Sequence, residues 1–428
     1  MFQRIDVWDI VDPKFTSIES YFKSKNTQEQ SYESLHPEYY LPERVMFLDG
    51  VSQSVQKGVE TYHEALVQPA MFAHPNPKRV AIIGGGEGAT LREALKHKSV
   101  TNVTMIDIDE IMCKVSADVL YPLWNGCDDF KEENIPSSCF DHPRAHVRYE
   151  DALAWFIDRF LEDYGNEKFD VIIMGKFYCN FIAITLQVSV NIFHLNKTDA
   201  LDPQDTVEFA NILYQDLSFW QSIYNALTED GILVAQLGNS PHLWQGSDQD
   251  NMNIRRFKNT QVLEKVGFAT THSYEESHCE FGNSWTFLLV CKSQECNKNW
   301  YKSSAQVEIA IHERILPSKS GLPLMKHFDG AIMAQYRFPH KGANTVFCRS
   351  YPTPVECHLL DGLIKEWNKG DIQNPGTLIS VSLDKVLSDI CEDEEDCKVC
   401  KRFIHNQVFD HSFLYPNRHL SAIKTRFV

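Results

Sequence analysis

The chain has 428 residues, 43% of them hydrophobic, which is enough for two or three domains with packed cores. Its 58 acidic and 41 basic residues give a formal net charge of −17, which argues against nucleic acid or an anionic membrane as a partner. The N-terminus, MFQRIDVWDIVDPK, has neither the apolar core of a secretion signal nor an Arg-rich transit pattern. Because the twelve cysteines are scattered, reduced thiols and a cytoplasmic location are expected.

Residues 1–60 alternate turn-rich and aromatic segments, which predicts a small N-terminal β-hairpin domain. From 61 to 298, strand patterns alternate with helical patterns, which is typical of a doubly wound α/β domain with a mostly parallel sheet. Its strands are expected at residues 80–83, 103–108, 145–149, 169–174, 232–236 and 285–291. Residues 299–428 form a C-terminal extension for which the sequence indicates no role.

The most informative segment is residues 79–110, which combines a buried strand, a glycine-rich turn, a helix and a second strand ending in acidic residues. Glycines at a strand–helix junction let the backbone pass close to a ligand and leave helix N–H groups pointing outward. An acidic residue about twenty positions on suits a ribose diol, and here it is Asp107 or Asp109. The segment therefore predicts a site for an adenosine-type nucleotide. The glycines of the turn are Gly84, Gly85, Gly86 and Gly88.

Glu87 narrows the choice of ligand, because it stands among these glycines where a dinucleotide would place its pyrophosphate. A carboxylate there repels phosphate and favours a cationic adenosine ligand such as S-adenosylmethionine or a relative. Ordinary S-adenosylmethionine still carries a carboxylate, whereas the decarboxylated form has only an amine at that end. The alternative interpretation is a solvated Glu87 on a surface loop.

Several motifs between residues 47 and 292 resemble those of the polyamine aminopropyltransferases, the family of spermidine, spermine and thermospermine synthases. These motifs are FLDGVSQS, TYHEALVQPAMFAHPNPKRV, GGGEGATLREALKH, DIDE, HPRAHVRYEDALAWF and a later D-A-L-D-P. Most members have Asp in the glycine turn. The version with Glu, followed by a Thr two residues after the last glycine, resembles the thermospermine synthase branch.

The resemblance implies an α/β fold of the class I methyltransferase (Rossmann-like) type. It also implies transfer of the aminopropyl group of decarboxylated S-adenosylmethionine to a polyamine, with release of methylthioadenosine. Spermidine as acceptor, giving thermospermine or spermine, is favoured over putrescine. The donor is a co-substrate, so neither a cofactor nor a metal is expected. The family also implies a homodimer or homotetramer.

The site residues that the resemblance implies form three groups. The general base is Asp199, the first acidic residue of D-A-L-D-P. The donor is bound by Gln53, Gly84, Gly86, Glu87, Asp107 and Asp151. The acceptor is bound by Tyr62, His63, Asp202 and Gln236. For His63 packing is an equal alternative, and the two acidic residues of D-A-L-D-P could instead only cap a turn before Pro203. Phe281 lies near the place where many relatives have a tyrosine, and it cannot provide that hydroxyl.

One segment interrupts the family pattern. The strand expected at 169–174 would continue directly into D-A-L-D-P, but residues 175–198 intervene. Deleting these 24 residues leaves FDVIIMDALDPQD, and the ends of the interval suit splice signals, so we hypothesise an unspliced intron. A genuine surface insertion is one alternative. A membrane segment is the other, although FIAITLQVSVNIFHL is too short and too polar for a bilayer span.

Two further alternatives stay open from the sequence. A methyltransferase dependent on S-adenosylmethionine shares the expected fold, and a non-catalytic binding protein could retain it.

A C-x-x-C pair in the C-terminal extension, with one cysteine before it and two histidines after it, could also suggest zinc. Only one close cysteine pair is present, so unremarkable thiols are the preferred interpretation. The residues are Cys391, Cys397, Cys400, His405 and His411.

Overall fold

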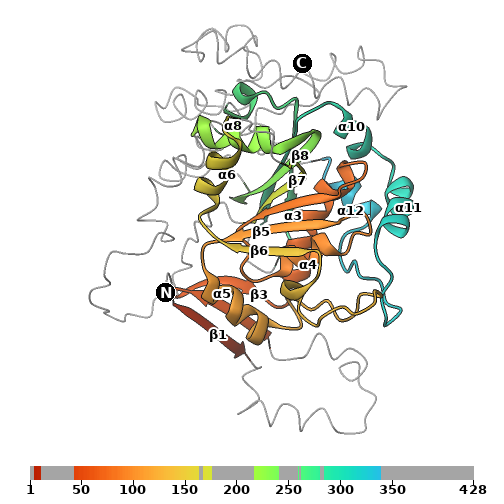
Figure 1. The fold of residues 1–428 in the computed structure, drawn as a ribbon. Helices are drawn as coiled ribbons and strands as arrows, with labels where there is room; N and C mark the ends of the chain where they lie inside the picture. Colours follow the sequence, from red (N-terminus) through yellow and green to blue (C-terminus); the bar gives the residue numbers. More distant parts are fainter. Residues whose placement is uncertain are drawn as a thin grey trace, which may run out of the picture.

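The computed structural model describes residues 4–10, 43–162, 167–175, 216–240, 259, 262–279 and 284–338. Its centre is a seven-stranded sheet with helices on both faces, and a separate three-stranded antiparallel sheet lies at one end (Figure 1). The predicted α/β fold class, with a mostly parallel sheet and a small N-terminal β domain, is confirmed. Among these residues, none of the helices has the length and apolar character needed to cross a membrane.

The large sheet has the strand order β6-β5-β4-β7-β8-β10-β9. Neighbours from β6 to β8 are parallel, and β10 and β9 complete the sheet in antiparallel pairs. The central strands are almost wholly apolar because helices cover both of their faces. The strands are β4 Arg79–Ile83, β5 Asn102–Asp107, β6 Ala145–Tyr149, β7 Phe169–Met174, β8 Leu227–Asn239, β9 Thr270–Glu276 and β10 Trp285–Cys291.

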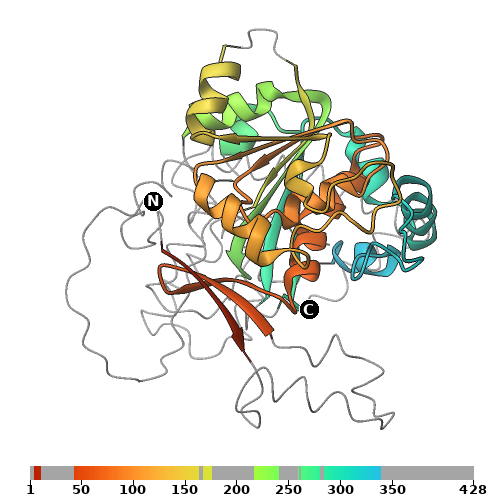
Figure 2. The same ribbon diagram turned by 60° about the horizontal axis from the view of Figure 1, so that its bottom comes forward.

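The small sheet contains β1 Ile5–Ile10, β2 Glu43–Leu48 and β3 Val51–Val55 in that order. Its inner face packs through Met46 and Leu48 on Met112 and on Trp124, whose indole N–H also donates to the Ser54 hydroxyl. Figure 2 shows this sheet beside the helix that follows β5. The chain passes from β3 through a short turn into α3 Val59–Ala73, so the small sheet lies next to the start of that helix.

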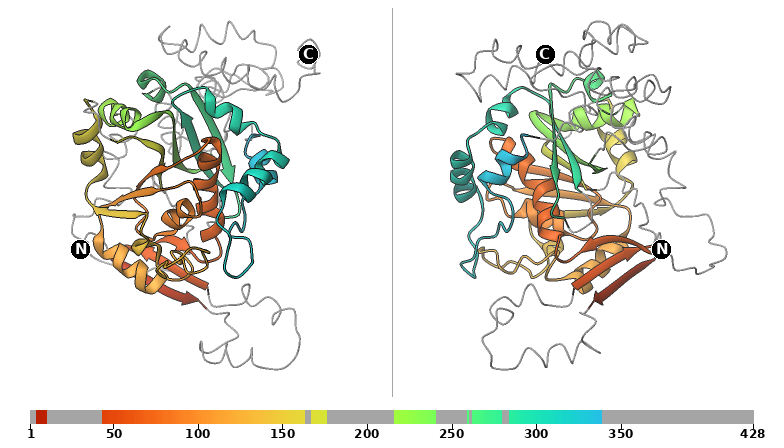
Figure 3. Two further views of the ribbon diagram at one scale, coloured as in Figure 1. Left: turned by 45° about the vertical axis from the view of Figure 1, so that its right-hand side comes forward. Right: turned by 180° about the vertical axis from the view of Figure 1, so that it is seen from behind.

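The helices divide between the two faces of the large sheet. One face is covered by α3 and α4 and by the C-terminal helices, which Figure 3 shows along one flank of the molecule. The other face is covered by α6 and α8. The bounds are α3 Val59–Ala73, α4 Ala89–Leu95, α5 Glu110–Val115, α6 Ala152–Phe160, α8 Leu217–Ala226, α10 Glu295–Trp300, α11 Ser304–Arg314 and α12 Gly330–Gln335, with the short helices η2 Ser116–Leu120 and η3 Cys139–Asp141.

The first forty residues of the predicted C-terminal extension, 299–338, pack against α3. The fully buried carboxylate of Glu64 accepts the backbone N–H groups of Lys326, His327 and Phe328 at 2.7–2.8 Å. The ammonium of Lys96 completes its environment at 3.2 Å. Because a buried carboxylate must be satisfied in this way, the contact fixes the extension to the helix that carries Tyr62 and His63.

Four cysteines form two buried disulfides, Cys127–Cys139 and Cys291–Cys296. The expectation of reduced thiols is wrong for these four. Within each pair the fold brings the two Cα atoms to 5.2 and 6.3 Å respectively, across loops of 12 and 5 residues, and such proximity is not visible in the spacing alone. The other described cysteines, Cys113 and Cys279, are buried and lie outside disulfides.

Candidate active site

The predicted donor residues meet at one edge of the large sheet. Gly84 follows β4, Asp107 ends β5, Asp151 comes shortly after β6 and Gly175 follows β7. These four strands are parallel, so their carboxyl ends lie side by side in register. Open α/β sheets bind ligands at this edge, where the loops after the strands converge. Gly84, Asp107, Asp151 and Gly175 therefore lie together at this edge, and the roles predicted for Gly84, Asp107 and Asp151 stay predictions.

The glycine turn after β4 is open at one glycine and tightly packed at another. Gly84, Gly85 and Gly88 have positive φ angles of 74°, 95° and 83°, a region that side chains with a Cβ rarely enter. A Cβ added at Gly84 would meet nothing within 4 Å, so this part of the turn is open to a ligand. A Cβ at Gly88 would come within 2.7 Å of Asn125 and Phe140, so that glycine is needed for packing.

The carboxylate of Asp107 is held by the glycine turn. One oxygen accepts the N–H of Gly86 at 2.8 Å and the other accepts the N–H of Asp109 at 2.9 Å. A carboxylate has about four lone-pair sites, so capacity remains for a ribose diol. Asp109 is 2% exposed, and it caps α5 by accepting two N–H groups of the first turn. Of the two acidic residues that the sequence offered, only Asp107 lies at the accessible edge.

Asp151 begins α6, where one of its oxygens accepts the N–H groups of Leu153 at 2.8 Å and Ala154 at 3.3 Å. Aspartate is favoured at this position because it satisfies N–H groups that have no partner within the helix. Its exposed side chain can therefore face a ligand while the helix fixes its orientation. The position agrees with the predicted contact to an adenine amino group, which stays a prediction.

Ile108 and Tyr149, next to Asp107 and just before Asp151, expose 43% and 44% of their surface. Large apolar groups at a ligand edge provide a surface for a flat base. Burial raises the pKa of the Tyr149 phenol above its ordinary value, so the hydroxyl stays neutral. The sequence did not single out either residue, and a contact of both with a base is a proposal. The usable signal was their position at the ends of two predicted strands.

Glu87 is enclosed by the protein. One of its carboxylate oxygens lies 2.7 Å from Nε2 of His63, and the two side chains are 12% and 3% exposed. The other ring nitrogen of His63, Nδ1, lies 3.0 Å from the hydroxyl of Thr90. The alternative of a solvated Glu87 on a surface loop is therefore wrong, because Glu87 is mostly buried and contacts His63 of α3. His63 is buried and contacts Glu87, which agrees with the packing interpretation, and its predicted contact with the acceptor stays a prediction.

Tyr62 and Gln236 lie around the end of β7. The hydroxyl of Tyr62 donates to the carbonyl of Gly175 at 2.9 Å, and its ring meets that of Trp285 edge-on at 6.3 Å. Gln236, near the end of β8, is 1% exposed, and its side-chain oxygen has no hydrogen-bond partner among the described residues. Gln53 lies half-buried in β3. It stands at a β-bulge, between Ser52 and Ser54, which pair with Phe47 and Met46 of β2.

Several predicted features lie outside the described residues. They are the base Asp199, the acceptor residue Asp202, Phe281, residues 176–198 of the insert and the cysteines and histidines between 391 and 411. The proposed roles of these residues stay predictions.

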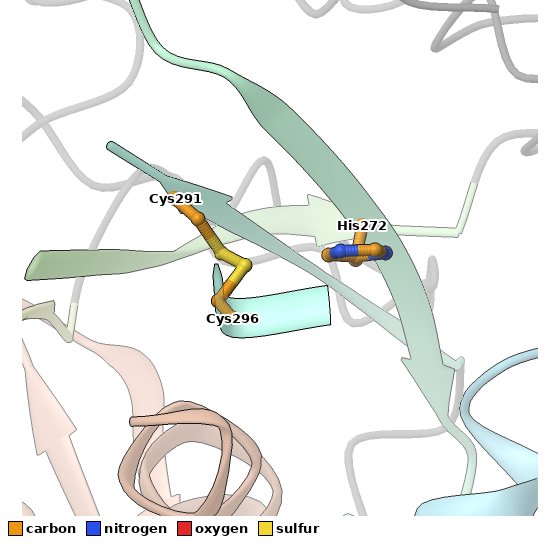
Figure 4. A group of neighbouring side chains, drawn as sticks. All are labelled: His272, Cys291 and Cys296. Carbon is orange, nitrogen blue, oxygen red and sulfur yellow. A yellow bond between two sulfur atoms is a disulfide. The ribbon is translucent and has the colours of Figure 1, made fainter. Parts of the chain in front are cut away.

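A second cluster lies at the far end of β10, away from Trp285. His272, Cys291 and Cys296 have potential metal-ligand atoms within 4.8 Å of one another, and Figure 4 shows the two sulfurs bonded together. Sulfurs joined in this way are not thiolate ligands. His272 bonds through Nε2 to Asn297 at 2.9 Å and stacks on Trp300. This cluster therefore serves packing between β9, β10 and α10.

Comparisons with known proteins identify the family. A family model described as the Spermine/spermidine synthase domain matches residues 59–177. The polyamine aminopropyltransferase of Thermococcus onnurineus is 33% identical over 249 residues, which cover 58% of this chain and 68% of the relative. The chain belongs to the polyamine aminopropyltransferase family. The protein is therefore an aminopropyltransferase, and the alternative of a methyltransferase is set aside.

Other similar proteins carry related names. The polyamine aminopropyltransferase of Pyrobaculum calidifontis is 36% identical over 248 residues, which cover 58% of this chain and 68% of that relative. A crystal structure of spermidine synthase from Thermotoga maritima has 22% identity and a TM-score of 0.48, over 71% of this chain and 79% of that one.

Proposed function

We propose that this aminopropyltransferase uses decarboxylated S-adenosylmethionine as donor and a polyamine as acceptor, and releases methylthioadenosine. The observation that carries the proposal is the carboxylate of Glu87, which the protein encloses within the glycine turn and holds at 2.7 Å from His63. Asp107, Asp151 and the open backbone at Gly84 supply contacts for the adenosine part of the donor. The aminopropyl arm of the donor then extends toward Glu87.

The charge of Glu87 selects between two forms of the donor. An ammonium about 4 Å from a carboxylate gains roughly 4 kcal/mol at the effective dielectric constant near a protein surface. A second carboxylate at the same distance loses a similar amount, unless a cation or water intervenes. The donor that has lost its carboxylate therefore binds with the attraction and without the repulsion.

The transfer step is a substitution at carbon. A neutral amine nitrogen of the acceptor attacks the methylene carbon beside the sulfonium, and the carbon–sulfur bond breaks with its electron pair passing to sulfur. The nitrogen then carries an extra proton, which a carboxylate must accept. Asp199 has this role in the proposal, with Asp202 on the acceptor. Tyr62, whose hydroxyl donates to the carbonyl of Gly175, and Gln236 of β8 contact the acceptor in this proposal.

Spermidine is the acceptor that we propose, with thermospermine or spermine as product. The support is the Glu of the glycine turn together with Thr90, which resemble the thermospermine synthase branch. Putrescine, which would make the protein a spermidine synthase, is the competing acceptor. Incubation with each amine separately and mass analysis of the products distinguishes them.

The donor is tested by titrating the 428-residue chain with decarboxylated S-adenosylmethionine and with S-adenosylmethionine. We expect the decarboxylated donor to bind at least about tenfold more tightly, because about 1.4 kcal/mol of the expected difference suffices for that ratio. A clear preference for the carboxylated donor would overturn the proposal. Methylthioadenosine serves as the control, since it contains the adenosine part and no aminopropyl group.

A further inference from the structure

His63 joins three segments of the chain through its two ring nitrogens. It lies in the first half of α3 and contacts Glu87 of the glycine turn through Nε2 at 2.7 Å. Through Nδ1 it contacts the hydroxyl of Thr90, in the first turn of α4, at 3.0 Å. His63 is 2% exposed and Thr90 is fully buried. Solvent is therefore largely excluded from the Nδ1 contact.

The chemistry of these groups limits where the protons of the His63 ring can lie. An ionised carboxylate only accepts hydrogen bonds, so Nε2 must carry the hydrogen that it donates to Glu87. In a neutral ring, Nδ1 is then an acceptor, and the hydroxyl of Thr90 is the donor that reaches it. Without that hydroxyl a buried nitrogen would lack a partner, which is unfavourable.

We infer that Thr90 is a positioning residue for the donor: it holds His63 in the Nε2–H form and so aims the Glu87 carboxylate at the donor's ammonium. The inference rests on the proposed function. Thr90 suits this role because a β-branched side chain at the start of a helix has few rotamers.

The imidazole orients Glu87 through a single hydrogen bond. A lysine or arginine at this place would orient Glu87 but would also cancel its charge toward the ligand. In the Nε2–H form that the inference assigns to His63, the ring orients the carboxylate by one hydrogen bond and brings no charge of its own. Thr90 thereby contributes to donor selection without touching the donor.

The test uses Thr90→Val, which removes the hydroxyl at nearly constant shape, and Thr90→Ser, which keeps it. Both variants of the 428-residue chain are titrated with decarboxylated S-adenosylmethionine and with methylthioadenosine. The valine variant should bind the decarboxylated donor about tenfold more weakly and methylthioadenosine within about twofold of the parent. The serine variant should restore donor binding.

Two results would overturn the inference. Equal weakening of both ligands by Thr90→Val would indicate a structural role, and unchanged binding of both would indicate no role. If the parent chain bound neither ligand, the proposed function itself would fail, which is a distinguishable outcome. Should the valine variant not fold, nitrogen NMR of His63 in the parent chain decides, because a proton on Nδ1 in place of Nε2 contradicts the inference.

Discussion

The hydroxyl of Tyr62 donates a hydrogen bond of 2.9 Å to the carbonyl of Gly175, the first residue after β7. Gly175 is also the first residue of the segment that we hypothesise to be an unspliced intron. In a chain without residues 175–198, Asp199 would follow Met174 directly and would occupy this place. Tyr62 would then stand beside the proposed base, on the path of the attacking amine.

Tyr62→Phe, in a chain lacking residues 175–198, should lower kcat about tenfold and leave the affinity for methylthioadenosine unchanged. The phenol contributes one hydrogen bond near the reacting nitrogen, and such a bond is worth about 1 kcal/mol or somewhat more. Steady-state kinetics and a titration measure the two quantities. A matching loss of methylthioadenosine binding would assign Tyr62 to the packing of α3 instead.

Asp199→Asn in the same shortened chain should reduce turnover by about 10²–10⁴, the usual contribution of a positioned general base. Donor binding should stay nearly intact, since Glu87, Asp107 and Asp151 are built by other segments. Single-turnover rates and donor titrations separate the two effects. If donor affinity fell as far as the rate, Asp199 would have a structural role.

Glu87→Gln should weaken binding of decarboxylated S-adenosylmethionine and narrow its advantage over S-adenosylmethionine. The amide keeps the size of the side chain and removes the charge that attracts one donor and repels the other. Titration of the variant with both donors provides the measurement. Unchanged discrimination would locate donor selection elsewhere in the site.

A carboxylate at the end of β9 predicts a pH dependence of stability. Burial raises the pKa of Glu276, but hydrogen bonds from His327, Tyr336 and His278 outweigh this and lower it to about 2. Burial lowers the pKa of His327, and its hydrogen bond to Glu276 at 2.8 Å reverses this, so the pKa lies above its ordinary value. The ion pair therefore forms at pH values above the pKa of Glu276 and below the raised pKa of His327.

The sign of the His327 contribution follows from its raised pKa. Its stabilisation is fully present below the unfolded pKa of about 6.5 and is lost as the pH rises through the folded value. His327→Gln should lower Tm by about 2–4 °C near pH 5.5 and by less above neutral pH, as thermal unfolding at a series of pH values can measure. His278→Gln, at an exposed partner of the same carboxylate, is the control and should change Tm less. A pH-independent loss would contradict the ion-pair account.

The strands that sequence patterns predicted best are those with continuous apolar runs. The bounds of β7 and β10 agree with the prediction, because hydrophobic residues between turn signals mark buried strands. β9 was missed. Its sequence, TTHSYEE, is polar, yet Tyr274 and Glu276 are buried by contacts with Tyr336 and His327, more than fifty residues further on. Such long-range satisfaction of polar groups leaves no local periodicity.

The candidate site divides in the same way. Gly84, Asp107 and Asp151 could be placed at the ligand edge, because a turn and two strand ends define them locally. The contact of Glu87 with His63 joins residues 24 positions apart, and only packing of α3 on the turn creates it. Thr90, in the first turn of α4, contacts the other ring nitrogen of His63. The sequence drew attention to Thr90 but did not indicate this contact.

Aminopropyl transfer itself is the most direct test of the account. The 428-residue chain and a chain lacking residues 175–198 are each incubated with decarboxylated S-adenosylmethionine and either spermidine or putrescine, and the polyamine products are identified by mass. A catalytic group must be held to about 0.5 Å, and 24 residues between Met174 and Asp199 would leave the base poorly placed. We expect the shortened chain to transfer well to spermidine and the longer chain to transfer poorly. Equal activity of the two would contradict the intron hypothesis, and no transfer by either chain would contradict the proposed function.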